Sequence, residues 1–211
     1  TSPNLDNKCD VNKGLRFSRQ LLSDINEIGI PCSLEWLNLL TPQYLGDFVS
    51  WGAIGARTVS SQIHRQMTSG LSSVVGFKNC TSGDFTPSIN AMKSASQEHT
   101  FFAIGKDGTP CVFDTTGNSD THVVLRGGKS GPNYTKEYVT ACRDQMIEMG
   151  VLPNIMIDCS HDNSRKNYKN QSMVLNDICE QLQEDDCPII GVMIESNINE
   201  GNQDINNKPL K

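Results

Sequence analysis

Six short apolar runs, separated by segments with helical spacing, limit the folds open to this chain of 211 residues. The runs cover residues 31–37, 51–57, 74–78, 122–126, 155–158 and 189–195. Most are rich in Val, Ile and Ala without strict alternation, which is typical of parallel strands that are covered on both faces. Strands that alternate with helices predict βαβ units and one parallel sheet, so the fold class is α/β.

The segments around these runs carry helix and hairpin signals. A long amphipathic helix is expected over residues 12–28, where Gly29 stops it. Shorter helices are expected near 42–49, 60–69, 86–96, 136–149 and 173–183. A further strand pair, 100–104 and 110–114, flanks Asp107-Gly108, which is a hairpin signal. We predict that this pair is an inserted β-hairpin and not part of the main sheet.

The number of runs leaves two architectures open. Six strands are two fewer than a closed (β/α)₈ barrel contains. No helix is predicted after the last run, because residues 197–211 are polar and lack a helical period. An open doubly wound sheet and part of a (β/α)₈ barrel both fit this pattern. Without internal repeats or long low-complexity segments, residues 1–211 are predicted to form a single domain.

Composition excludes several classes of function. With 18 basic and 24 acidic side chains the net charge is −6, so the surface is predicted to repel nucleic acid and anionic membranes. The longest apolar stretch, residues 188–194, is far shorter than the roughly 20 residues of a membrane-spanning helix. Eight cysteines without a Cys-x-x-Cys pair predict free thiols in the reducing cytoplasm, and the first residues lack the apolar core of a signal peptide.

Three cations each close one of the apolar runs. They are Arg57, Lys78 and Arg126, and each has glycine within two residues, which would let a ligand approach the backbone. Because parallel strands end at one rim of a barrel, we expect these side chains to gather there. Arginine's planar fork suits carboxylate and phosphate, and lysine is a mobile charge that can donate a proton. The alternative is that each is a solvated charge where a strand leaves the core.

Glu35, His161 and Glu195 lie at the same strand ends. Imidazole and carboxylate suit Mn, Fe, Zn or Co, but two ligands do not make a site, and a lone strand-end histidine is more often structural. Ser160 beside His161 could indicate a Ser–His pair. Neighbours in an extended segment point to opposite faces, however, and no nucleophile elbow, dinucleotide fingerprint or P-loop is present.

Eight motifs, in chain order, resemble the class I 3-deoxy-D-arabino-heptulosonate 7-phosphate (DAHP) synthases. They lie at residues 43–45 (QYL), 51–58 (WGAIGART), 61–65 (SQIHR), 69–72 (SGLS), 75–79 (VGFKN), 124–129 (VLRGGK), 156–164 (MIDCSHDNS) and 191–203 (GVMIES through EGNQ). Together they span nearly the whole chain. The resemblance implies a (β/α)₈ barrel, of which this chain holds about six strands and is incomplete at both ends.

The same resemblance implies an activity. DAHP synthases are transferases that condense phosphoenolpyruvate with erythrose 4-phosphate, with release of phosphate, in the first step of the shikimate pathway of aromatic amino acid biosynthesis. Lys78 would donate the proton that turns the aldehyde oxygen into a hydroxyl. Carried over motif by motif, the phosphoenolpyruvate site would comprise Glu35, Ala56, Arg57, Lys78 and Arg126.

The resemblance also implies a cofactor and an effector. His161 and Glu195 would be two ligands of a divalent metal ion (Mn, Fe, Co or Zn). An aromatic amino acid would bind away from the barrel mouth, and a homo-oligomer is expected. The residues that fall where that effector pocket would lie are Gln43, Leu71, Ser72 and Phe101.

Some parts of the family pattern have no match here. The family's cysteine ligand after the first strand, its aspartate ligand near the C-terminus and its erythrose 4-phosphate motif are absent from the sequence. The chain therefore carries about half of the expected active site. A second hypothesis is a non-catalytic truncated barrel or pseudo-enzyme that binds phosphate compounds or pairs with another chain. The paired motifs at 55–58 and 125–129 disfavour a different phosphosugar aldolase.

Overall fold

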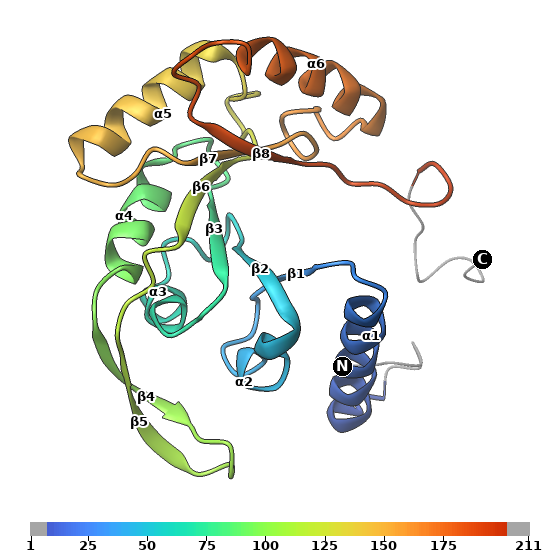
Figure 1. Ribbon diagram of the computed structural model, residues 1–211, viewed down its shortest axis with the longest axis vertical. Coiled ribbons are helices and arrows are strands. Elements are labelled where there is room, and N and C mark those ends of the chain that lie inside the picture. The colour runs from blue at the N-terminus through green and yellow to red at the C-terminus, as the bar shows by residue number, and fades with distance from the viewer. Residues whose placement is uncertain (1–7, 202–211) are drawn as a thin grey trace.

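A computed structural model describes residues 8–201, and it contains one parallel sheet of six strands in the order β1-β2-β3-β6-β7-β8 (Figure 1). These strands are β1 (Cys32–Glu35), β2 (Val49–Ile54), β3 (Val74–Lys78), β6 (Thr121–Leu125), β7 (Ile155–Asp158) and β8 (Ile189–Met193). The predicted strand order along the chain is confirmed. Part of the predicted polar C-terminal segment and of the last motif, residues 202–211, lies outside the described residues.

One helix precedes the first strand, and the other helices lie between strands along the chain. The helices are α1 (Val11–Glu27), α2 (Pro42–Leu45), α3 (Gln62–Ser69), α4 (Thr86–Ala95), α5 (Lys136–Glu148) and α6 (Gln171–Gln181), with 3-10 turns η1 (Gly46–Phe48) and η2 (Tyr168–Asn170). The expected helix over 42–49 is wrong in part, because η1 follows α2 and Val49 already begins β2. Strands β1, β2 and β8 end earlier than predicted, so Leu37, Arg57 and Glu195 lie in the segments that follow them.

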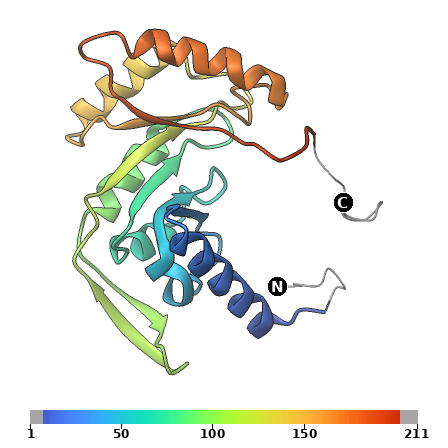
Figure 2. The ribbon, with the colours of Figure 1, turned by 45° about the vertical axis from the view of Figure 1, so that its right-hand side comes forward.

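The sheet curls, and helices α3 to α6 lie along its convex side (Figures 1 and 2). A doubly wound sheet would carry helices on both faces, so that alternative does not hold. The fold is a partial (β/α)₈ barrel. Side chains with no exposed surface fill the layer between sheet and helices, including Ile54 of β2, Phe77 of β3, Leu125 of β6 and Ile178 of α6. Burying each of these contributes roughly 1.5–3 kcal/mol.

The predicted hairpin is confirmed. Strands β4 (His99–Ile104) and β5 (Pro110–Thr115) pair antiparallel and project away from the main sheet (Figure 1). The chain reverses through Gly108, whose φ of +82° suits glycine. The hairpin therefore interrupts the βαβ order between β3 and β6 without adding a strand to the sheet.

The amino-terminal end of the sheet holds a pair of rings, the half-buried Trp51 and the buried His122. Trp51 Nε1 of β2 donates a hydrogen bond to His122 Nε2 of β6 at 3.2 Å. Gly76 of β3 lies between them, since a Cβ there would come within 2.6 Å of Trp51 and 2.9 Å of His122. Burial lowers the pKa of His122 to about 4, so the neutral ring accepts the bond at pH 7. This histidine packs the end of the sheet opposite to Lys78, as its place in the sequence predicts.

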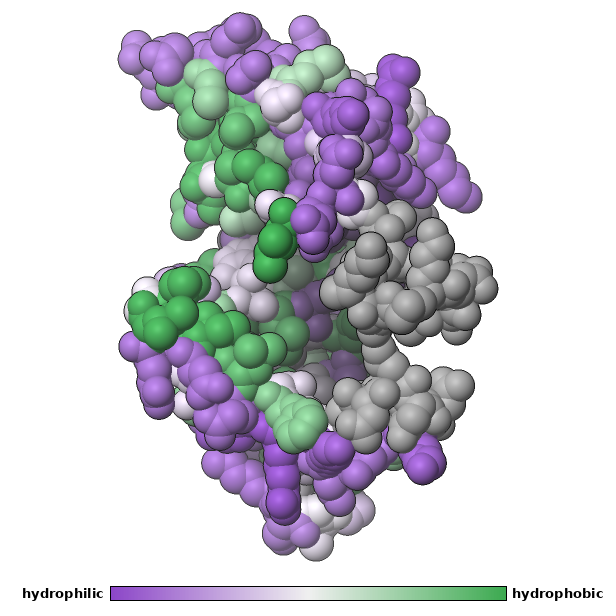
Figure 3. Space-filling view, turned by 90° about the vertical axis from the view of Figure 1, so that its right-hand side faces the viewer, coloured by the Kyte–Doolittle hydropathy of each residue, from purple (hydrophilic) through white to green (hydrophobic). Residues whose placement is uncertain are grey.

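The open side of the partial barrel exposes apolar side chains. Ile190 and Val192 of β8, Ile194 beyond it, and Leu37 after β1 are all exposed. Figure 3 looks at this side and shows apolar surface around a recess between the upper and lower parts of the molecule. Apolar side chains are therefore exposed at both edges of the sheet, next to β1 and along β8. Among residues 8–201, no helix has the length and apolarity that crossing a membrane requires.

Candidate active site

Lys78 and Arg126 lie at the ends of neighbouring strands. Lys78 is the last residue of β3 and pairs in register with Val124 of β6, two residues before Arg126. Both cationic side chains are almost completely buried, with 8% of each residue exposed. Buried cations need anionic or hydrogen-bonding partners, and both have them. The interpretation of these two as solvated surface charges is therefore wrong.

The partner of Lys78 is Asp158, the last residue of β7. Its carboxylate has no exposed surface, and its Oδ2 lies 3.3 Å from Lys78 Nζ and 2.8 Å from His161 Nδ1. Burial alone would raise the pKa of Asp158, but hydrogen bonds from His161 and Ser160 and the charge of Lys78 outweigh burial and lower it. Asp158 is thus an ionised group that joins two predicted site residues. Asp158 lies within the motif at 156–164, but no role was predicted for it from the sequence.

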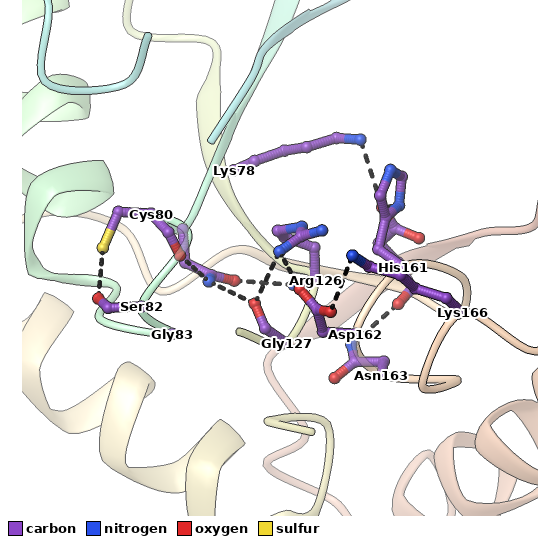
Figure 4. A network of polar contacts seen from close by, with 12 residues as sticks. Lys78, Cys80, Ser82, Gly83, Arg126, Gly127, His161, Asp162, Asn163 and Lys166 are labelled. Carbon is purple, nitrogen blue, oxygen red and sulfur yellow. Dashed lines mark hydrogen bonds and ion pairs between the residues drawn. The ribbon is translucent and has the colours of Figure 1, made fainter. Parts of the chain in front are cut away.

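The guanidinium of Arg126 is held by Asp162. Its Nη1 donates to Asp162 Oδ2, and Lys166 Nζ lies 4.0 Å from the other carboxylate oxygen. In Figure 4, Asp162 lies between Arg126 and Lys166, close to His161. The ion pair fixes one edge of the guanidinium and leaves its remaining N–H groups as possible donors to an anion.

Three buried asparagines connect the loops around Arg126. Asn79 Oδ1 accepts from the backbone N–H of Arg126 at 2.8 Å and from Asn133 Nδ2 at 3.2 Å. Asn163 Oδ1 accepts from the backbone N–H of Asn133 at 2.8 Å, and Asn163 Nδ2 donates to the carbonyl of Leu125 at 3.1 Å. The segments after β3, β6 and β7 are therefore tied together. These residues were missed as site residues, although each lies within or close to a quoted motif.

The glycines after Arg126 serve these loop contacts. A Cβ on Gly128 would lie 2.2 Å from the backbone nitrogen of Gly83, and one on Gly127 would lie 2.6 Å from that of Asn163. Gly127 also has a φ of +73°. The expectation that they leave room for a ligand is therefore wrong for Gly127 and Gly128, because backbone of neighbouring loops occupies that space.

His161 and Glu195 lie side by side, with His161 Nε2 3.6 Å from Glu195 Oε1. Gln171 at the start of α6 holds the backbone of Glu195 through its side-chain amide. Its Nε2 donates to the Glu195 carbonyl and its Oε1 accepts from the Glu195 N–H, both at 2.9 Å. Two ligand bonds of about 2.1 Å can span up to about 4 Å, so this separation fits one metal ion between the two atoms. No group of three or more His, Cys, Asp or Glu side chains suited to a metal occurs among residues 8–201. The described chain therefore supplies two candidate ligands.

Ser160 differs from its prediction. His161 has a φ of +50°, so the segment is not extended, and Ser160 Oγ lies 2.8 Å from His161 Nδ1. The expectation that the two side chains point to opposite faces is wrong. Ser160 Oγ donates its hydrogen to Asp158 Oδ1 at 2.6 Å, which makes it a support for the carboxylate and not a nucleophile.

Arg57 stands apart from the buried cluster. It lies in the turn after β2, its side chain is exposed, and within residues 8–201 no side-chain partner is recorded for it. Glu35 approaches the same strand end, because a Cβ on Gly55 would lie 2.0 Å from Glu35 Oε1. Ala56, which directly precedes Arg57 in the sequence, is half-buried. The sheet order places Arg57 at the same rim as Lys78 and Arg126, but no direct contact joins it to them.

The cysteines offer no additional metal ligand in this cluster. All eight are free thiols, as predicted. Burial, together with the nearby Asp158 charge, raises the pKa of Cys159 to about 11, so its thiol is protonated at neutral pH. Cys32 is buried and packs against the end of α1, where Asn26 Nδ2 lies 3.5 Å from its sulfur. Neither Cys32 nor Cys159 is therefore assigned as the family's cysteine ligand of the metal.

A separate apolar cavity of about 890 Å³ lies between the hairpin β4–β5 and helices α2 and α3. Gln43, Leu71 and Phe101 line it, and Ser72 is not among the lining residues. Gln43 Nε2 donates to the carbonyl of Ile104 at 2.6 Å, which ties α2 to the hairpin. Three of the four predicted effector residues are thus together, away from the strand ends.

Comparison with known proteins now adds to this geometry. The model of the DAHP synthetase I family matches residues 1–210. The chain belongs to this family. The resemblance found in the motifs is therefore confirmed over almost the full sequence.

Named relatives agree with the family assignment. The Tyr-sensitive phospho-2-dehydro-3-deoxyheptonate aldolase of Escherichia coli K12 is 48% identical over 201 residues, which are 95% of this chain and 56% of the relative. The Phe-sensitive aldolase of the same organism is 46% identical over 203 residues, 96% of this chain and 58% of the relative. This member of the DAHP synthetase I family thus spans little more than half the length of these relatives.

A solved structure supports the fold. The phospho-2-dehydro-3-deoxyheptonate aldolase of Francisella tularensis SCHU S4 superposes with a TM-score of 0.96 at 51% identity, over 99% of this chain and 61% of that one. The curled sheet described above is therefore the arrangement found in a family member of greater length.

Proposed function

We propose that this chain forms the central and C-terminal part of a DAHP synthase, which condenses phosphoenolpyruvate with erythrose 4-phosphate and releases phosphate. The observation that carries the proposal is the cluster of Lys78, Asp158, His161 and Glu195 beside Arg126, at neighbouring strand ends of a family member. Cations and metal-binding side chains are what a reaction between two phosphorylated substrates requires.

In this proposal the cations bind phosphoenolpyruvate. Arg126, already oriented by Asp162, presents its free N–H groups to the phosphate or carboxylate. Arg57, which has no recorded side-chain partner among the described residues, is free to turn toward the same anion, with Glu35 and the backbone of Ala56 beside it. The net charge of −6 elsewhere makes this cationic rim the attractive place for an anion.

Lys78 is proposed to donate the proton during carbon–carbon bond formation. When the enolpyruvate methylene carbon attacks the aldehyde carbon, the aldehyde oxygen gains negative charge and must become a hydroxyl. Water adds to the neighbouring carbon of the enolpyruvate, and phosphate then leaves that carbon. The ammonium of Lys78 lies 3.3 Å from Asp158 and can give a proton to an oxygen placed on its other side. Lysine suits this role because it carries both the charge and a transferable proton.

His161 and Glu195 would hold a divalent metal ion. Their facing nitrogen and oxygen atoms, 3.6 Å apart, fit the distance between two ligands of one ion. Such an ion supplies Lewis-acid polarisation of a carbonyl oxygen when it is bound. Imidazole and carboxylate are ligands that Mn, Fe, Co and Zn all accept.

Regulation by an aromatic amino acid is proposed at the cavity between the hairpin and helices α2 and α3. Relatives are named Tyr-sensitive and Phe-sensitive. The cavity's apolar walls, which include Leu71 and Phe101, suit an aromatic side chain, and Gln43 adds a polar group. A homo-oligomer and a cytoplasmic location are expected with this function.

The test of the proposed function is phosphate release from the two substrates in the presence of Mn²⁺. We expect none from the 211-residue chain alone. A chimera in which this chain replaces the matching 201-residue segment of the Tyr-sensitive Escherichia coli relative should be active. Comparing the chain with the chimera also tests the alternative that the chain is a non-catalytic pseudo-enzyme. The similarity to named aldolases does not favour that alternative. A folded chimera that binds phosphoenolpyruvate and stays inactive would contradict the proposal, and turnover by the chain alone would contradict the account of missing ligands.

A further inference from the structure

The carboxylate of Asp158 has a hydrogen-bond donor at every position where it can accept one. Oδ1 accepts from the Ser160 backbone N–H at 2.9 Å and from Ser160 Oγ at 2.6 Å. Oδ2 faces Lys78 Nζ at 3.3 Å and His161 Nδ1 at 2.8 Å. These donors come from the loop that follows β7 and from β3, which lies two strands away from β7 in the sheet. A fully buried carboxylate with four donors is held in one orientation.

The pattern of donors determines which nitrogen of His161 carries the hydrogen. Nδ1 has two neighbours, Ser160 Oγ at 2.8 Å and Asp158 Oδ2 at 2.8 Å. The single hydroxyl hydrogen of Ser160 is donated to Asp158 Oδ1, and an ionised carboxylate only accepts. Both neighbours of Nδ1 are therefore acceptors, so Nδ1 must be the donor.

The other nitrogen then carries a lone pair. In the neutral ring with hydrogen on Nδ1, Nε2 is an acceptor, and it faces Glu195 Oε1 at 3.6 Å. Two acceptors without a hydrogen between them repel each other unless a cation lies there. The left-handed backbone of His161, with φ +50°, is unfavourable at a non-glycine residue, so surrounding contacts must maintain this orientation.

We propose that Asp158 is a positioning residue that, together with Ser160, holds His161 as the Nδ1–H tautomer and directs its Nε2 lone pair at a divalent cation shared with Glu195. Metal-binding histidines commonly donate their second N–H to a carboxylate in this way. The role of the cation rests on the proposed function, whereas the tautomer depends only on the contacts of the chain itself.

Asp158→Asn tests this role because the donors dictate how an amide would sit. The two Ser160 donors require an oxygen at the Oδ1 position, which leaves the NH₂ group at the Oδ2 position. That NH₂ group would donate to His161 Nδ1 and force the hydrogen onto Nε2. The matched control is Asp162→Asn, which also removes one carboxylate that is paired with cations but has no recorded contact with the His161 side chain.

The experiment records two-bond ¹H–¹⁵N correlations of the histidine rings in the 211-residue chain at pH 8, with His161→Gln to assign the signals. The wild type and Asp162→Asn should show His161 as Nδ1–H, and Asp158→Asn should show Nε2–H. Broadening of the His161 signals by Mn²⁺ should require at least tenfold more metal in Asp158→Asn than in the control.

Three outcomes would overturn the proposal: an Nε2–H or doubly protonated His161 in the wild type, an unchanged tautomer in folded Asp158→Asn, or equal broadening by Mn²⁺ in both variants. The wild-type spectrum tests the predicted His161 tautomer even if Asp158→Asn does not fold. Since no substrate is present, failure here is separate from an inactive chimera, which would instead overturn the proposed reaction.

Discussion

Arg126→Ala should weaken the binding of phosphoenolpyruvate to this chain by about 10-fold to 150-fold. A charge-assisted hydrogen bond to phosphate or carboxylate contributes about 1.5–3 kcal/mol, and each 1.4 kcal/mol corresponds to a tenfold change. Removing Arg126 also leaves Asp162 with Lys166, at 4.0 Å, as its one remaining cationic partner among residues 8–201, so the site becomes more negative. Isothermal titration without metal measures the effect on this site alone.

The control for this titration is Arg143→Ala. Arg143 lies on α5, where it pairs with its neighbour Asp144, and it belongs to neither strand-end cluster. Both substitutions remove one positive charge, so a general charge effect would change the two affinities equally. Equal losses in the two variants, or no loss in Arg126→Ala, would contradict the assignment of Arg126 to the anion site.

Lys78→Met should lower turnover of the active chimera by about 10²-fold to 10⁴-fold, the usual contribution of a positioned proton donor. The substitution also takes away the ammonium group that faces the buried carboxylate of Asp158, which destabilises the fold. Steady-state phosphate release, together with circular dichroism for folding and titration with phosphoenolpyruvate, measures the two effects separately.

Lys78→Arg separates charge from proton transfer. Arginine keeps the positive charge that Asp158 needs, but it does not give up its proton in proteins. We expect this variant to fold and bind phosphoenolpyruvate while its turnover stays low. Near-normal turnover in Lys78→Met or Lys78→Arg would exclude Lys78 as the proton donor.

Much of the fold could be predicted because its signals are local. Short apolar runs mark the six strands, and Asp107-Gly108 marks the hairpin turn, where Gly108 has a φ of +82°. The ends of β1, β2 and β8 were misplaced, since apolar residues such as Leu37 and Ile194 continue past the last strand pairing. Apolar character alone does not reveal where strand pairing stops.

The candidate site was predictable only in part. Lys78 and Arg126 were found because parallel strands end at one rim, and their partners Asp158 and Asp162 were missed because those contacts join distant segments. The contact between Ser160 and His161 depends on the left-handed backbone of His161. No residue type in this segment indicates such a conformation, because His161 is not a glycine.

The buried asparagines show a further limit of sequence reasoning. Asn79, Asn133 and Asn163 lie in polar loops that resemble solvent-exposed segments, yet almost none of their surface is exposed. Each instead bonds backbone groups of other loops, such as Gly127 N–H, which donates to Asn133 Oδ1 at 2.7 Å. Only the folded arrangement of the three loops reveals that these side chains replace water.

Whether the strand-end cations share one anion is measured most directly by a crystal structure of this chain with phosphoenolpyruvate bound. We predict one molecule whose phosphate and carboxylate contact Arg126 and Lys78, with Arg57 turned from solvent toward it. A second cavity, of about 380 Å³, is lined by Lys129, Arg165 and Lys166. Phosphoenolpyruvate held only there would contradict the assignment, as would Arg57 directed away from the bound anion.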